Sequence, residues 1–174
     1  MRILAIAGSL RARSSNRTVL EAARLLAPAG LEIVLYDGLG ELPLFNPDLD
    51  RDPPPPPIAH LRAAIGDADG LLICSPEYAR GVSAVLKNAL EWLVSSHEFP
   101  GKPVAVINAS QRSSDADSQL RLILETMSAR LIEPASITIP MLGRDLDAAG
   151  LVEDARLGEA LRQALIDFAD AIPC

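Results

Sequence analysis

The chain has 174 residues, the usual size of one domain and enough to bury a substantial core. Hydrophobic residues make up 49% of it and charged residues 22%, which excludes an intrinsically disordered protein, and a net charge of −7 argues against nucleic acid as the main partner. No apolar run approaches the roughly 18 residues that a membrane-spanning helix needs, so we expect no membrane partner.

Two further features bear on where the protein works. The cysteines, Cys74 and Cys174, do not suggest a disulfide framework, and no signal segment precedes the first predicted strand. We therefore expect a cytoplasmic protein that forms a single domain over residues 1–174.

Short apolar segments alternate along the chain with segments of helical spacing. Strands are expected at residues 2–7, 31–36, 70–75, 103–109 and 135–139. Helices are expected at residues 16–26, 58–67 and 82–96, over a stripe from Leu120 to Leu131, and at residues 153–172. This alternation, with strands that are apolar on both faces, predicts an α/β doubly wound parallel sheet.

A long irregular stretch, residues 37–57, includes five consecutive prolines and is expected to be a rim loop of the same domain. Phe45 in this loop either covers a ligand, contacts a second subunit or packs against its own core. Trp92, beside the apolar stripe of the 82–96 helix, either extends the core or anchors a subunit contact; core packing is the default.

The first turn, Gly8 to Asn16, lies between a buried strand and a helix start, where backbone N–H groups and the helix dipole favour an anion. Ser9, Ser14 and Asn16 add side-chain donors. Arg11, Arg13 and Arg17 stand where the dipole disfavours cations, which is easiest to understand if a phosphate lies among them. The alternative is an N-capped helix with solvated arginines.

Right-handed crossovers bring the turns after the first, third and fourth strands to one edge of the sheet. Residues 9–16, 76–81 and 110–113 are therefore expected to surround one crevice. The first turn has a single glycine, so the dinucleotide fingerprint is absent, and no Gly-Lys-Ser/Thr of a P-loop is present. A mononucleotide such as FMN is the phosphate-bearing ligand that remains.

Four motifs resemble the NAD(P)H-dependent FMN reductase family, over roughly residues 1–140. They are Gly8-Ser9-Leu10-Arg11-x-x-Ser14-x-Asn16, Leu42-Pro43-Leu44-Phe45-Asn46, Pro76-Glu77-Tyr78 and Leu86-Lys87-Asn88-Ala89. The resemblance implies a flavodoxin-like sheet with strand order 2-1-3-4-5 and a homodimer or homotetramer.

The resemblance also implies the roles of individual residues. Ser9, Arg11, Ser14 and Asn16 would hold the FMN phosphate, and Pro76, Glu77 and Tyr78 would lie against the isoalloxazine ring. The turn with Ser110 and Gln111 would reach the ring through its backbone, and Gln111 or Arg112 would face a pyridine nucleotide. The family usually has Asn where this chain has Ala79, and a glycine-rich turn where it has Ala109 to Ser114.

By this resemblance the chain is an FMN-dependent oxidoreductase that passes hydride from NADPH or NADH to a small-molecule acceptor (free flavin, a quinone or similar) in a ping-pong cycle. FMN would carry the chemistry, so no catalytic side chain or metal is expected. His60 and His97 are expected to be surface residues, and Cys74 a small buried residue of the core and not a redox thiol. Arg80 would pair with Glu77 across subunits, meet the NAD(P)H phosphates, or be a solvated rim residue. The alternatives to an enzyme are a flavin-binding electron carrier and a non-catalytic flavodoxin-like protein.

Overall fold

A computed structural model describes residues 1–112, 114–141 and 143–173. Its centre is a parallel five-stranded sheet in the order β2-β1-β3-β6-β7. The strands are β1 (Arg2–Ala7), β2 (Glu32–Leu35), β3 (Gly70–Cys74), β6 (Pro103–Ile107) and β7 (Arg130–Leu131). Because β4 and β5 belong to a separate hairpin, β6 and β7 are the fourth and fifth strands of this sheet, and its strand order is 2-1-3-4-5. All neighbouring strands are parallel, so the predicted α/β doubly wound architecture is confirmed.

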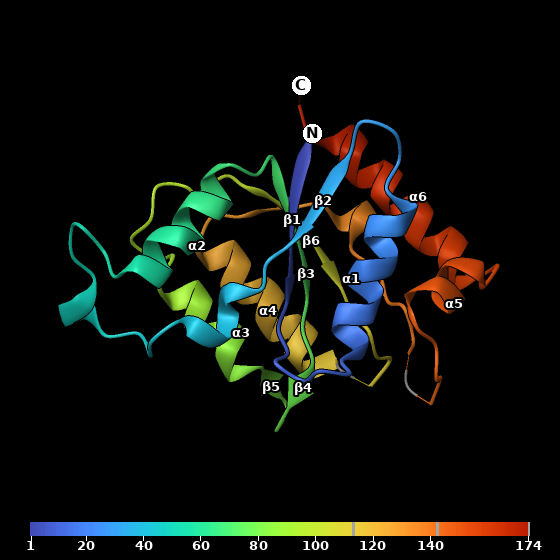
Figure 1. Cartoon of the computed structure of the whole chain (residues 1–174), viewed down its shortest axis with the longest axis horizontal. Coiled ribbons are helices and arrows are strands. Elements are labelled where there is room, and N and C mark those ends of the chain that lie inside the picture. The colour runs from blue at the N-terminus through green and yellow to red at the C-terminus, as the bar shows by residue number, and fades with distance from the viewer. Residues whose placement is uncertain (113, 142, 174) are drawn as a thin grey trace.

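Helices cover both faces of the sheet (Figure 1). One face carries α1 (Ser15–Leu26), α5 (Ala148–Glu153) and α6 (Leu157–Ala171), whose apolar residues form one core cluster with the sheet. The other carries α2 (Pro56–Gly66), α3 (Ala84–Glu91) and α4 (Ser114–Thr126), which form a second cluster. All five residues of β3 are buried, because this central strand is covered on both sides.

The fifth strand is where the predicted elements and the structure differ most. We expected residues 135–139, whereas β7 is Arg130–Leu131, followed by a 3₁₀ turn at Glu133–Ala135 and a single bridge between Asn108 and Thr138. Pro134 lies in the 3₁₀ turn that takes the chain out of the sheet. Where backbone pairing with β6 is interrupted after β7, the Ser136 hydroxyl takes its place. It accepts from the Val106 N–H at 3.1 Å and donates to the Ile132 carbonyl at 3.0 Å.

Three predicted helices are shorter in the structure. The stripe predicted from Leu120 to Leu131 ends with α4 at Thr126, because Leu131 belongs to β7. The expected 82–96 helix is α3 alone, because Val82 belongs to a short strand and residues 92–95 form turns. The expected 153–172 helix is α6, preceded by the separate short helix α5. A small antiparallel hairpin of β4 (Glu77–Tyr78) and β5 (Gly81–Val82), expected only as a turn, follows β3.

The rim loop after β2 is tied to α3. It contains 3₁₀ turns at Gly38–Glu41 and Pro47–Leu49. The Asn88 side chain accepts from the Phe45 N–H and donates to the Pro43 carbonyl, which also accepts from the indole N–H of Trp92 at 2.8 Å. Phe45 packs edge-on against Trp92, which is fully buried, so both aromatic residues serve the core of their own chain.

Within the described ranges no helix is both long and apolar enough to cross a membrane.

Candidate functional site

The first turn leaves β1 at Gly8 and is held close to the third strand. The Gly8 N–H donates to the Cys74 carbonyl at 2.8 Å, and a Cβ atom at Gly8 would stand 3.0 Å from the hydroxyl oxygens of both Ser75 and Ser83. Asn16, at the start of α1, accepts a hydrogen bond from the Cys74 thiol at 3.2 Å. Burial raises the pKa of that thiol, so Cys74 is a structural residue as expected.

Ser14 stands at the N-cap position of α1, and its hydroxyl is left without a partner. The residue is 4% exposed, and no group in the described part of the chain accepts from or donates to its Oγ atom. An N-cap serine ordinarily accepts from a backbone N–H of the first turn. Here that bond is missing, so the buried hydroxyl and the free N–H groups of the helix start are available to a ligand.

The three arginines of this turn behave differently from one another. Arg17 pairs with Glu21 and Asp37, and Arg13 pairs with Asp145 at 3.3 Å, so each of these two guanidinium groups has an acidic partner in its own chain. Among residues 1–112, 114–141 and 143–173, the Arg11 side chain has neither an ion pair nor a hydrogen bond.

The β4–β5 hairpin lies at the carboxyl end of β3, beside the first turn (Figure 1). One carboxylate oxygen of Glu77 accepts from the Ala116 N–H at 3.0 Å, in the first turn of α4. This bond stabilises the helix start, because a carboxylate there complements the helix dipole. Tyr78 is 50% exposed and presents an aromatic ring at the rim.

The tip of the hairpin is Ala79-Arg80, and both residues have positive φ angles, 50° and 61°. The Arg80 carbonyl accepts from the Gln119 side chain at 2.9 Å, and the Arg80 guanidinium lies 3.3 Å from the Asp115 carboxylate. Within its own chain, Arg80 therefore pairs with Asp115. These three bonds hold the hairpin against α4. They fix Pro76, Glu77 and Tyr78 relative to the turn after β6, which we call the fourth turn because β6 is the fourth strand of the sheet in chain order.

The fourth turn follows β6 and is ordered by its own side chains. The Ser110 N–H donates to the Asn108 side chain at 2.9 Å, and the Arg112 N–H donates to the Ser110 hydroxyl at 3.2 Å. Ser113, which we placed in the same crevice, lies outside the described residues.

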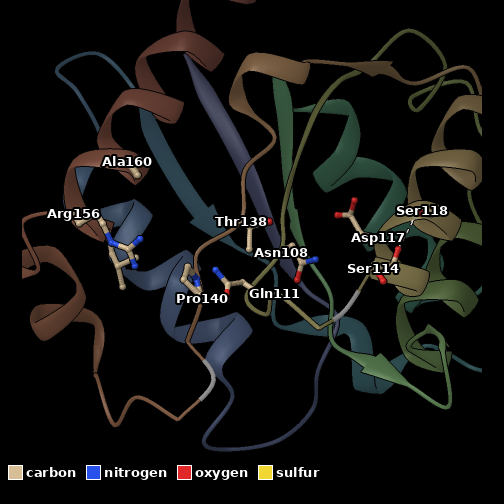
Figure 2. A pocket seen from close by; sticks show the side chains of 10 residues that line it. Asn108, Gln111, Ser114, Asp117, Ser118, Thr138, Pro140, Arg156 and Ala160 are labelled. Atoms are coloured by element: carbon tan, nitrogen blue, oxygen red, sulfur yellow. Dashed lines mark hydrogen bonds between the residues drawn. The ribbon is translucent and has the colours of Figure 1, made fainter.

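Gln111 faces a separate hollow of about 510 Å³ between α4 and α6. Figure 2 shows Ser114, Asp117 and Ser118 on one side of it and Arg156 and Ala160 on the other, with Gln111 between them.

The structure thus brings most of the expected residues to one edge of the sheet. Gly8 and Asn16 of the first turn bond to Cys74 at the end of β3, and Glu77 and Arg80 of the hairpin bond to residues in the first turn of α4. Sequence reasoning missed the segment 144–150, which lies against the first turn and encloses with it a hollow of about 820 Å³. Its sequence, with Arg144 and two aspartates, gives no motif that points to this contact.

These residues fit the phosphate of FMN. A buried hydroxyl without a partner, a helix start and an uncommitted guanidinium are the donors that a phosphate monoester requires. Within the described residues no group of three His, Cys, Asp or Glu side chains could hold a metal ion. His60 and His97 are both exposed.

Comparison with known proteins identifies the family of the chain. A family model described as NADPH-dependent FMN reductase matches residues 1–142. An NAD(P)H-dependent FMN reductase of Pseudomonas aeruginosa is 34% identical over 170 residues, which cover 95% of this chain and 91% of that protein. A 2-hydroxy-1,4-benzoquinone reductase of Burkholderia sp. is 35% identical over 164 residues, which cover 90% of this chain and 88% of that protein.

Among solved structures, the flavoenzyme NAD(P)H:(acceptor) oxidoreductase FerB of Paracoccus denitrificans has a TM-score of 0.87 and 28% sequence identity. The match covers 98% of this chain and 96% of that one. The chain therefore belongs to the NADPH-dependent FMN reductase family, as a flavodoxin-like oxidoreductase that uses FMN and NAD(P)H.

Proposed function

We propose that the protein transfers electrons from NAD(P)H to a quinone or free flavin, with the two substrates occupying the crevice of the three turns one after the other. Bound FMN supplies the chemistry, since it accepts a hydride and returns the electrons to an acceptor. The observation that carries this proposal is the buried Ser14 hydroxyl, which has no protein partner in the described part of the chain and stands at the start of α1.

Each turn has a distinct task in this proposal. The first turn holds the FMN phosphate through Ser9, Arg11, Ser14 and the backbone N–H groups at the start of α1. Asn16 acts there mainly through its backbone, because its side-chain oxygen is bonded to Cys74.

The turn after β3, which contains the β4–β5 hairpin, supports the flavin ring through Pro76 and Tyr78. Glu77 keeps the hairpin against α4 through its bond to the Ala116 N–H. Ser110 and Gln111 supply backbone groups to the ring from the fourth turn. Arg80, 86% exposed in its side chain, faces the NAD(P)H phosphates from the hairpin tip.

The acceptor is a small planar molecule. The Burkholderia relative is named for a benzoquinone, and the half-exposed ring of Tyr78 offers a flat apolar surface at the rim. NAD(P)H and a quinone both need access to one face of the flavin, so a single open crevice accounts for their alternate use.

We also propose that residues 1–174 form one domain, that the protein is a cytoplasmic enzyme, and that it assembles as a homodimer or homotetramer. Support for assembly comes from Leu44 and Val94, which are 84% and 69% exposed on the rim loop and directly after α3. We place the subunit contact at these two side chains, because assembly there would remove apolar surface from water.

The visible absorption of the purified protein, before and after NADPH is added without oxygen, tests the proposal. A yellow protein that bleaches, and then regains its colour when a benzoquinone is added, is the expected result. A yellow protein that neither NADPH nor NADH bleaches would be an electron carrier. A colourless protein that also fails to take up FMN would contradict the proposed site.

A further inference from the structure

The hollow beside Gln111 lies at the end of the sheet, on the side of β6 away from the first turn. We call it the α4–α6 hollow, because the start of α4 forms one wall and the start of α6 the other (Figure 2). Asn108 and Thr138, which form the last bridge of the sheet, both line it. The strands β1 and β3, which lead into the first turn and the hairpin, lie on the opposite side of β6. The hollow is therefore not a continuation of the flavin phosphate site.

The acids on the α4 side of this hollow already have cationic partners. Asp117, which lines the hollow, pairs with Arg121 at 2.7 Å, and Arg121 also pairs with Glu133 outside it. Asp115, in the first turn of α4, pairs with Arg80 at 3.3 Å. Each of these carboxylates is therefore held by a guanidinium group of its own chain.

The α6 side supplies a cation that has no such partner. Asp154 accepts from the Arg156 N–H at 3.1 Å, while its other carboxylate oxygen pairs with Arg144 at 3.3 Å. Glu159, in the first turn of α6, pairs with Arg162 at 3.4 Å. Across the described ranges, the Arg156 guanidinium itself has neither an ion pair nor a hydrogen bond. Among the described residues that line the hollow, Arg156 is therefore the one whose charge is not compensated.

Two helix starts add to the positive potential of the hollow. Helix α4 has 13 residues and α6 has 15, and the first residue of each, Ser114 and Leu157, lines the hollow. The start of a long helix carries about half a positive elementary charge, which disfavours a cation beside it. An unpaired arginine at the start of α6 is therefore easiest to explain by an anion that binds in the hollow.

The lining also limits the kind of anion. The single uncompensated cation matches one negative charge, which favours a carboxylate over a phosphate dianion. Leu157, Pro140 and Ala160 contribute apolar surface, which an inorganic ion would leave in contact with water. The volume of about 510 Å³ lies in the range of small-molecule pockets, about 300–1,000 Å³, so there is room for an organic body.

We propose that the α4–α6 hollow binds a small aromatic carboxylate. The carboxylate pairs with the Arg156 guanidinium in a bidentate arrangement, and the ring packs on Leu157, Pro140 and Ala160. Gln111, whose amide end points toward the Arg156 side of the hollow in Figure 2, donates a further hydrogen bond to the carboxylate. This site goes beyond the proposed function and does not depend on bound flavin.

Titration calorimetry of the purified protein at neutral pH tests this with naphthoate and with naphthamide, its neutral analogue. We expect naphthoate to bind roughly tenfold or more tightly than naphthamide, because hydrogen bonds to a charged group are the stronger ones. Arg156→Gln should remove that preference, whereas Arg156→Lys, which keeps the charge but not the bidentate geometry, should keep part of it. Arg162→Gln is the matched control, since its side chain pairs with Glu159 outside the hollow.

A second variant tests whether the ligand enters the hollow. Ala160 lines it and is exposed, so Ala160→Trp fills the space and leaves the Arg156 charge in place. We expect this variant to abolish naphthoate binding. Ala155→Trp, at an exposed residue outside the hollow, should bind naphthoate as the unsubstituted protein does. Circular dichroism and FMN content should be the same for all these variants, because the substituted residues are exposed and lie outside the flavin site.

Three results would overturn the inference. If naphthoate binds no more tightly than naphthamide, the hollow does not recognise a carboxylate. If Arg156→Gln or Ala160→Trp leaves the affinity for naphthoate unchanged, the acid binds elsewhere. If saturation with FMN removes naphthoate binding, the acid occupies the flavin crevice. A protein that binds naphthoate as expected but takes up no FMN would keep this inference and lose the proposed function, so the two fail separately.

Discussion

The hairpin tip between β4 and β5 allows a quantitative test of the structure. Ala79 and Arg80 form a two-residue connection with φ angles of 50° and 61°, a conformation that Asn and Gly adopt far more easily than other residues. An L-residue in this region costs about 1–2 kcal/mol, and Asn reduces that cost through local hydrogen bonds of its side chain. Ala79→Asn is therefore expected to stabilise the fold by about 0.5–1 kcal/mol.

Arg80→Gly should gain much less, although its φ angle is just as unfavourable. Glycine loses more backbone entropy on folding, up to about 1 kcal/mol. The variant also gives up the exposed Asp115 ion pair, worth about 0–1 kcal/mol. These losses offset most of the relief of strain, so the expected change is close to zero.

Thermal unfolding followed by circular dichroism measures both variants. For a chain of this length, 0.5–1 kcal/mol corresponds to a rise in Tm of about 1–4 °C for Ala79→Asn. The matched control is Ala59→Asn on the exposed face of α2, where Asn is a poorer helix former and Tm should fall. If Ala79→Asn lowers Tm as Ala59→Asn does, the tip does not have the conformation described.

Arg11→Ala should weaken FMN binding by about 1.5–3 kcal/mol, or roughly tenfold to more than a hundredfold, in a fluorescence titration; unchanged affinity would remove Arg11 from the phosphate site. Glu77→Ala should cost about 1 kcal/mol in urea unfolding because the Ala116 N–H loses its carboxylate, and Glu77→Gln, which keeps an acceptor, should cost less. Gly70→Ala should destabilise the fold by about 1–3 kcal/mol, since its Cβ would approach neighbouring side chains at 2.9 and 3.0 Å, and a Tm equal to that of the unsubstituted protein would argue against this packing. The buried thiol of Cys74 should react with iodoacetamide only after unfolding, as peptide mass spectrometry would show; rapid labelling of the folded protein would contradict its burial.

Residues 2–7 and 70–74 show what local sequence can determine. Apart from the exposed Arg2 they carry no charged or polar side chain, they lie at the centre of the sheet, and they were predicted to within one residue. The edge strand was predicted less well, because its pairing depends on the Ser136 hydroxyl taking the place of a backbone group. Such a substitution is a tertiary effect with no periodic signal in the sequence.

The candidate site divides in the same way. The serines of the first turn could be identified because a strand, a turn and a helix start follow each other directly in the chain. The acids Asp145 and Asp37, which pair with Arg13 and Arg17, could not be identified, since they lie 132 and 20 residues away in the sequence. The helix dipole makes arginines unusual at a helix start. The local sequence does not show whether an acid of the same chain already neutralises them.

The hydrogen bonds between the rim loop and the residues of α3 and Trp92 make Trp92 an intrinsic fluorescent probe of the loop. It is the one tryptophan of the sequence, and its indole N–H is bonded to the Pro43 carbonyl inside the core. Detachment of the loop would expose this N–H to water and shift the emission to longer wavelength. Intrinsic fluorescence can therefore follow the loop separately from global unfolding, and it needs no label or engineered residue.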